Sequence, residues 1–213
     1  TRDADRTGTQ LNLMLLLRRS QEVQCAGSYP QGGRDGPAVY GGGLTSKQRW
    51  IVRRFDELVK QGRRILLFAQ SPETIELLAR HLREMGHDIV ALHGKIPPKK
   101  RMAEIEARFR HGQAHLLLTY KANKTGLNLP EGNHVLLYEH DWTPKTEDQA
   151  IGRAVRPEQR EDVIAEHVEI VGSIDEYMAQ MCSGKRMAAA AGLDFGEQDD
   201  REFLHLDSIL GRF

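Results

Sequence analysis

Short apolar runs alternate with amphipathic segments through the middle of the chain. The runs are rich in Leu, Ile and Val and have no polar face, which is typical of strands buried on both sides of a parallel sheet. We expect strands at 65–69, 89–92, 115–119, 135–138 and 163–171. Repeated strand–helix units with short connections predict an α/β fold in which helices cover both faces of a parallel sheet.

Helix start and stop signals lie between these strands. Thr45 with Gln48 and Ser173 with Glu176 have the spacing of a capping box, in which side chains and backbone groups cap each other. The other expected starts are Ser71-Pro72-Glu73, Pro97-Pro98 and Thr143-Pro144, and the expected ends are Gly62, Gly86, Gly112, Pro157 and Ala191. In the helix that begins at Pro97-Pro98, Met102, Ile105 and Phe109 are expected together on the buried side.

The ends of the chain differ from this alternating middle. Leu11 to Arg19 is a leucine-rich segment that we expect to form a helix packed on the rest of the protein. Gly27 to Gly43 is rich in glycine and indicates a mobile loop. We therefore divide the chain into an N-terminal helix and glycine-rich loop (1–43), a central lobe (44–172) and a C-terminal brace helix with a tail (173–213).

Composition limits the function classes less than the pattern does. Thirty basic and thirty acidic residues cancel, so a DNA-binding surface has to be a local patch. Cys25 and Cys182 match no zinc or disulfide spacing, which favours a reducing, intracellular setting. We expect no metal site at His111 and His115, because Gly112 interrupts the helix between them. No apolar run is long enough to span a membrane, and a first residue other than Met indicates a fragment of a longer chain.

Polar and basic residues follow the expected strands, at the edge where the carboxyl ends of parallel strands meet. Gln70-Ser71 follows the first strand, His93-Gly94-Lys95 the second and Thr119 to Leu129 the third. Open α/β sheets bind their ligands at this edge. Cations, amides and hydroxyls with few planar side chains suit a sugar–phosphate backbone, although ordinary turn chemistry accounts for any one of these loops taken alone.

The segment 149–159 carries the clearest candidate chemistry. Gln149, Arg153 and Arg156 are four and then three residues apart, so a single helix projects all three from one face. Arginine suits a phosphate whose charge grows in a transition state. A solvated basic face has the same spacing, so the spacing alone leaves both interpretations open.

Three stretches taken together resemble a known family. They are Thr119 to Leu129, the lead-in Asp141-Trp142-x-Pro144, and Gln149-Ala-x-x-Arg153-x-x-Arg156-x-x-Gln159. They are similar to motifs V and VI of the Swi/Snf-type branch of superfamily-two helicases. Ile65 to Gln70 resembles motif IV of the same family, and the resemblance extends over residues 11–190.

The resemblance implies the second RecA-like lobe of a DNA-dependent ATPase motor. ATP with Mg²⁺ would bind between this lobe and an N-terminal RecA-like lobe of the same chain, which supplies the phosphate loop and the metal ligand. Arg153 and Arg156 match the catalytic arginine fingers, and Gly126, Asn128 and Gln149 match nucleotide-binding positions. The positions that match a track along double-stranded DNA are Gln70, Lys95, Arg101, Thr119, Lys121, Thr125 and Trp142. No membrane partner is implied.

Two departures and one absence accompany the resemblance. The family has Ala-Gly-Gly where this chain has Ala122-Asn123-Lys124, and Pro157 replaces the glycine of motif VI. No Gly-x-x-x-x-Gly-Lys-[Ser/Thr] phosphate loop and no second metal motif occur in the sequence, so we expect the chain alone not to hydrolyse ATP. The Ile151-Gly152-Arg153 form of motif VI resembles prokaryotic and phage members of the family. It favours a cytoplasmic location, with a nuclear location as the alternative.

Two other functions are compatible with such a lobe. One is a non-catalytic RecA-like platform that binds DNA or protein in a degenerate motor. Arg153 and Arg156 argue against it, because a platform has no use for paired arginine fingers. The other is an RNA helicase lobe of the same superfamily, against which the Asp141-Trp142-x-Pro144 lead-in argues.

Overall fold

The structure is a computed structural model that describes residues 44–123, 127–141 and 143–191. The leucine-rich segment, the glycine-rich loop and the tail predicted above lie outside these residues. The same holds for Thr125, Gly126 and Trp142. Within the described ranges, none of the helices has the length and apolar character needed to cross a membrane.

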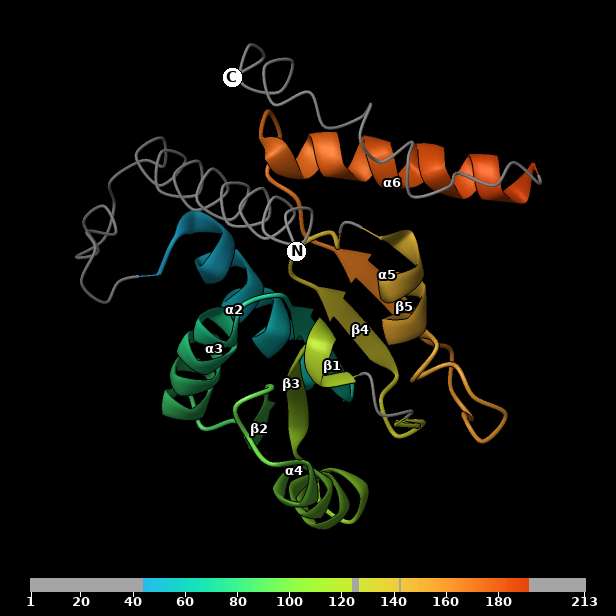
Figure 1. Cartoon of the computed structure of the whole chain (residues 1–213). Helices are drawn as coiled ribbons and strands as arrows, with labels where there is room; N and C mark the ends of the chain where they lie inside the picture. Colours follow the sequence, from blue (N-terminus) through green and yellow to red (C-terminus); the bar gives the residue numbers. More distant parts are fainter. Residues whose placement is uncertain (1–43, 124–126, 142, 192–213) are drawn as a thin grey trace.

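The described residues form a five-stranded parallel sheet in the order β2-β3-β1-β4-β5 (Figure 1). Its strands are β1 Ile65–Ala69, β2 Ile89–Leu92, β3 His115–Thr119, β4 His134–Leu137 and β5 Ile164–His167. In the central strand β1, Leu67 is in register with Leu117 of β3 on one side and Leu136 of β4 on the other. The predicted parallel α/β fold is confirmed. At β1 the connections of neighbouring strands run to opposite sides of the sheet. Sheets of this kind bind ligands beyond the carboxyl ends of the strands at such a point.

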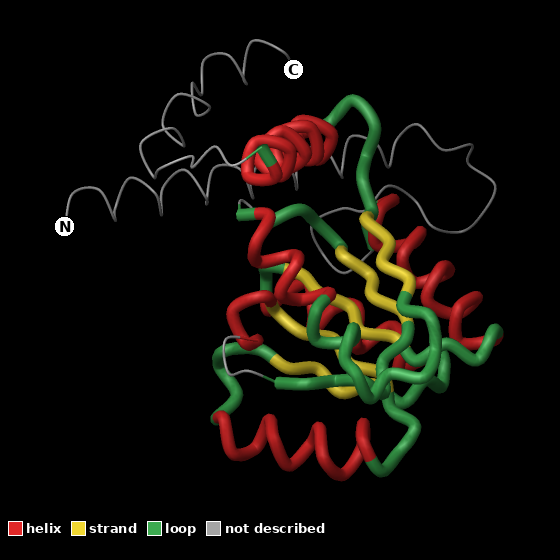
Figure 2. The backbone as a smooth tube through the Cα atoms, turned by 90° about the vertical axis from the view of Figure 1, so that its right-hand side faces the viewer, coloured by secondary structure: helices red, strands yellow, loops and turns green. Residues whose placement is uncertain are grey.

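Helices cover both faces of the sheet (Figures 1 and 2). One face carries α2 Ser46–Lys60 and α3 Pro72–Glu84, and the other carries α4 Pro98–Glu104, the π-helical turn Ile105–Arg110 and α5 Pro144–Ile151. Neighbouring residues of β1 serve the two layers: Leu67 belongs to the core with α2 and α3, whereas Leu66 packs with Phe109 and Ala150. A strand with two buried faces has to be apolar at successive positions, which is the pattern that predicted it.

Several predicted helix ends have the expected chemistry. The capping box forms, because Gln48 N–H donates to Thr45 Oγ1 at 3.2 Å and Thr45 N–H donates to Gln48 Oε1 at 2.9 Å. Ser71 Oγ accepts the N–H of the third residue after it at 3.4 Å. Gly62 and Gly86 follow α2 and α3 with φ of 77° and 92°, a left-handed conformation that glycine adopts without strain.

Other predictions differ from the structure at the edges of elements. β4 lies one residue earlier than expected, and β5 is shorter than the predicted 163–171 and partly exposed, because it is an edge strand. The prediction for Met102 is wrong, since this residue is 42% exposed. Ile105 and Phe109 are buried as predicted, and the wide π-helical turn that follows α4 brings them onto the sheet.

The last described helix, α6 Ile174–Ala190, lies beside α5 and the connection that enters it (Figures 1 and 2). Cys182 Sγ of α6 donates to Asp141 O of that connection at 3.3 Å. Ser173 Oγ caps the helix by accepting from Asp175 N–H at 3.1 Å. The second predicted capping box does not form, because Ser173 Oγ bonds one residue before Glu176, and Glu176 accepts from the N–H of Gly172 at 2.9 Å.

Candidate nucleotide and DNA-binding edge

The prediction of a single helix across 149–156 is wrong. α5 ends at Ile151, after which Arg153 N–H donates three residues back at 3.2 Å in a tighter turn. Gly152 favours a helix end, and Pro157 disfavours the helical conformation for the residue before it. Gln149 therefore lies on the last turn of the helix, whereas both arginines lie in the segment that follows it.

The predicted start of α5 is correct in position but not in chemistry. Thr143 is the residue before the helix and Pro144 its first residue, as expected. The Thr143 hydroxyl makes no capping bond. Asp141 holds this corner instead, because its Oδ1 accepts the N–H of Thr143 at 3.0 Å.

Arg153 and Arg156 remain electrostatic neighbours in the segment after α5. Burial lowers the pKa of Arg153, and the positive charge of Arg156 lowers it further. The two guanidinium groups are therefore close enough to repel each other electrostatically. Both residues are half-buried. The Nε of Arg156 is buried and has no hydrogen-bond partner among the described residues. Adjoining cations with a free donor suit a polyanion that brings both charge and acceptors.

Hydrogen bonds join this arginine segment to the loop that the sequence matched to motif V. Leu129 N–H donates to Arg153 O at 2.9 Å. The side-chain amide of Gln159 donates to Pro130 O at 2.7 Å and to Gly132 O at 2.8 Å. The two segments therefore form one hydrogen-bonded unit, with Gln159 as its clamp.

Two of the three predicted nucleotide-binding residues, Gln149 and Asn128, lie at or next to this hydrogen-bonded unit. Gln149 is exposed on α5, and Asn128 is exposed directly before the tethered Leu129. The carbonyl of Asn128 accepts from Nη2 of Arg110 at 3.0 Å, which holds its backbone in place. Gly126 lies outside the described residues.

Two of the residues predicted to contact DNA, Gln70 and Thr119, form hydrogen bonds within the protein. The side-chain amide of Gln70 donates to His140 O at 3.0 Å, and its N–H donates to Glu139 Oε1 at 2.6 Å. Thr119 is 2% exposed, and its Oγ1 accepts the N–H of Ala122 at 3.3 Å. Thr119 thus orders the turn after β3 and has no exposed hydroxyl for a ligand.

The predicted cations of the track lie nearer the surface. Lys95, with a side chain 71% exposed, has its Nζ 3.2 Å from Glu73 Oε1. Arg101 Nη1 donates to Ala122 O at 3.2 Å, so α4 supports the turn after β3. Lys121 is exposed on that turn, the 3₁₀ helix Tyr120–Asn123.

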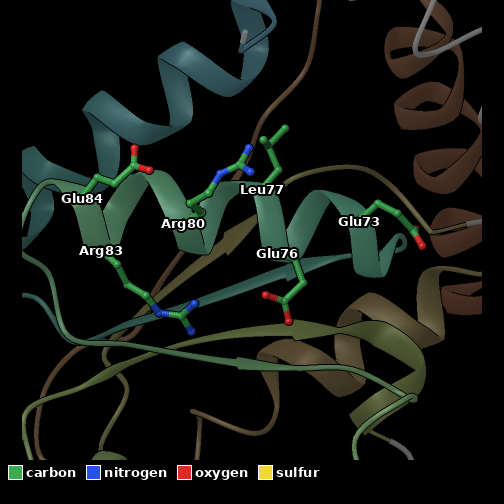
Figure 3. A pocket seen from close by; sticks show the side chains of 6 residues that line it. All are labelled: Glu73, Glu76, Leu77, Arg80, Arg83 and Glu84. Carbon is green, nitrogen blue, oxygen red and sulfur yellow. The ribbon is translucent and has the colours of Figure 1, made fainter. Parts of the chain in front are cut away.

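A shallow hollow also follows the outer side of α3 (Figure 3). Its lining comes from this one helix and carries both signs of charge, through Glu73, Glu76, Leu77, Arg80, Arg83 and Glu84. Mixed charge gives no preference for a phosphate, so the hollow is no part of the candidate site.

A buried polar cluster beside α5 was missed by sequence reasoning. Ligand atoms of His140, Glu147 and His167 lie within 4.8 Å of one another, a spacing at which metal sites occur. The rings of His140 and His167, however, stack with centroids 4.6 Å apart and planes 16° from parallel. The lone pairs of imidazole lie in the ring plane, so near-parallel rings do not aim at one ion. As arranged, His140 hydrogen-bonds to Glu147 and Glu169, whereas His167 contributes a stacked ring whose Nδ1 has no hydrogen-bond partner among the described residues.

A family model described as the helicase conserved C-terminal domain matches residues 46–158. The chain belongs to this family. Protein CHROMATIN REMODELING 24 of Arabidopsis thaliana is 26% identical to this helicase lobe over 172 residues, which are 76% of the chain and 16% of the relative. DNA excision repair protein ERCC-6 of Homo sapiens is 33% identical over 119 residues, which are 55% of the chain and 10% of the relative.

The fold of the lobe is also found in a solved structure. The crystal structure of the C-terminal part of the Fun30 ATPase domain matches it with a TM-score of 0.61 at 21% identity, over 65% of this chain and 45% of that chain. The RecA-like fold and the Swi/Snf-type relationship that the motifs indicated are thus confirmed. The lobe spans less than a fifth of the two curated relatives.

Proposed function

We propose that this lobe is the C-terminal half of an ATP-dependent, Swi/Snf-type DNA translocase. Arg153 and Arg156 act as arginine fingers on ATP, which binds with Mg²⁺ between this lobe and an N-terminal RecA-like lobe of the same protein. The observation that carries the proposal is the pair of half-buried arginines after α5, three residues apart, with the buried Nε of Arg156 that has no partner in the described part of the chain. The family match supports it.

The proposed role follows from the charge that phosphoryl transfer develops. Negative charge spreads over the phosphate oxygens in the transition state, and guanidinium groups stabilise it only when the lobes close over the nucleotide. An arginine finger contributes roughly 10³-fold or more to kcat. Gln149, Gly126 and Asn128 complete the nucleotide side of the cleft, and the bond from Leu129 to Arg153 transmits closure to the motif V loop.

The same edge forms part of a groove for the DNA backbone. Lys95, Arg101 and Lys121 supply cations, and Gln70 and Thr119 shape the surface that carries them. Thr125 and Trp142 belong to the same predicted track. The relatives' names refer to chromatin remodelling and DNA excision repair, which favours duplex DNA over RNA as the substrate.

A nuclear location and the domain division are also part of the proposal. Both named relatives are eukaryotic, one a plant and one a human protein, and this favours a nuclear location over a prokaryotic cytoplasm. The division into an N-terminal helix with a glycine-rich loop, a lobe over 44–172 and a brace helix with a tail from 173 is part of the proposal.

The deciding experiment uses the two-lobed protein, which is this lobe together with its N-terminal RecA-like lobe. It compares DNA-stimulated ATP hydrolysis by wild type and by Arg156→Ala. Loss of the finger is expected to lower kcat at least about a hundredfold with folding intact. Arg160→Ala is the matched control, because Arg160 is exposed beyond Pro157 and should leave kcat unchanged. An Arg156→Ala protein as active as wild type would overturn the motor proposal and leave the non-catalytic platform in its place.

A further inference from the structure

α6 is attached to the lobe by charged side chains near both of its ends. In its first turn, Asp175 Oδ2 lies 2.5 Å from Lys47 Nζ of α2, and the two side chains are 0% and 1% exposed. In its last turns, Arg186 Nη2 donates to Glu147 Oε2 at 2.8 Å and to Asp148 Oδ1 at 2.9 Å, so one guanidinium group holds two successive residues of α5. Ion pairs fix the helix in one register better than apolar contacts do, because they are directional.

Glu147 is the centre of the second attachment. Its side chain is fully buried on the inner face of α5, and its Oε1 accepts from Asp141 N–H at 2.8 Å and lies 3.0 Å from His140 Nδ1. Burial alone would raise the pKa of Glu147, but hydrogen bonds from His140 and Arg186 lower it below its usual value. Glu147 is therefore an ionised carboxylate that depends on its donors.

The other contacts of α5 are apolar: Ala150 and Ile151 pack against the core on one face of the sheet. The helix is eight residues long, too short to be stable alone, and its buried residues are Pro144, Glu147 and Ala150. A carboxylate therefore stands where an amphipathic helix normally has an apolar side chain. The orientation of α5 depends on the partners of Glu147, and the arginine segment begins where this helix ends.

We propose that Arg186 of α6 and Glu147 of α5 are positioning residues, which set the arginine segment 153–156 for catalysis. The inference rests on the proposed function of Arg153 and Arg156. Docking of α6 holds α5 in the orientation that points the arginines at the nucleotide. Displacement of α6 from α5 then weakens hydrolysis without touching either arginine.

The first test needs no activity. Hydrogen exchange is measured on this chain with Arg186→Gln, and with Arg80→Gln as the control, since Arg80 is exposed on the outer side of α3 (Figure 3). We expect the amides of α5 and of 152–154 to exchange at least about fivefold faster in Arg186→Gln, with α3 unchanged in both. Unchanged exchange in α5 of a folded Arg186→Gln protein would overturn the inference.

The second test is a double-mutant cycle on ATP hydrolysis by the two-lobed protein. Arg186→Gln alone should lower kcat about tenfold with KM for ATP unchanged, and Arg186→Lys should restore part of the loss. In the background of Arg156→Ala, Arg186→Gln should change kcat less than about twofold, because it acts through the arginine segment.

The outcomes of this cycle separate the two proposals. A normal kcat in Arg156→Ala contradicts the proposed function itself. A low kcat in Arg156→Ala together with a normal kcat in Arg186→Gln, or with purely additive effects, contradicts only the positioning role. Asp148→Asn provides a milder variant, because Asp148 is largely exposed and its change leaves no buried carboxylate unpaired.

Discussion

At the scale of single residues, the balance between burial and hydrogen bonds to carboxylates sets the pKa of each buried histidine. Burial, with smaller contributions from the charges of Arg64 and His87, lowers the pKa of His115 to about 4. His115 Nδ1 accepts the N–H of Ile65 at 3.1 Å, which only a ring without a proton on that nitrogen can do. At His140 burial acts in the same direction, but hydrogen bonds to carboxylates outweigh it and raise the pKa.

His115 should make the lobe sensitive to mild acid. The unfolded residue titrates near pH 6.5 and the folded one near 4, so the unfolded chain binds more protons in this window and stability falls as pH falls through it. His115→Asn keeps an acceptor and removes the titration. Between pH 7 and 5, the variant should lose about 2 kcal/mol less free energy of unfolding than wild type in urea titrations. Equal losses would show that folding does not change the pKa of His115.

At the scale of elements, glycine has two different roles in the helical layers. Gly112 follows the π-helical turn, and a Cβ there would collide with the carbonyl oxygen of Arg108. That carbonyl also accepts from Ala114 N–H at 3.0 Å as the chain enters β3. Gly184, by contrast, lies exposed within α6, where a methyl group would extend into open space.

The two glycines should therefore respond in opposite directions to the same substitution. Gly112→Ala is expected to lower the free energy of unfolding by about 1–3 kcal/mol, because the turn into β3 has to shift. Gly184→Ala is expected to raise it by about 1 kcal/mol through helix propensity. Denaturant titration of both variants checks the pair. A neutral Gly112→Ala would mean that the turn yields without cost.

At the scale of the whole molecule, the sequence predicted the sheet and its helical layers but not the details that build the site. Apolar runs and helix-start residues are local signals, and they predicted the strands and the helix starts to within a few residues, although not every predicted capping bond forms. The end of α5 was not, because Gly152 and Pro157 together outweigh the spacing of the arginines. The links from Gln159 to Pro130 and from Arg186 to Glu147 join residues far apart in the chain, and no spacing rule reveals such contacts.

A lobe that provides only fingers should be inactive alone. The 213-residue chain has no phosphate loop, so we expect ATP hydrolysis at background level with or without duplex DNA. A phosphate-release assay checks this, with the two-lobed protein as the positive control. Hydrolysis that copurifies with the chain and is lost in Arg156→Ala would contradict the division of roles between lobes.

The position of Cys182 has a practical consequence. Its thiol is buried between α6 and the connection into α5, and burial raises its pKa to about 12, so the reactive thiolate is scarce while α6 is docked. Alkylation of Cys182 requires α6 to move away from Asp141. In a Cys25→Ser variant, Cys182 is the remaining cysteine. The rate at which a thiol reagent labels it therefore reports how often α6 undocks from the lobe.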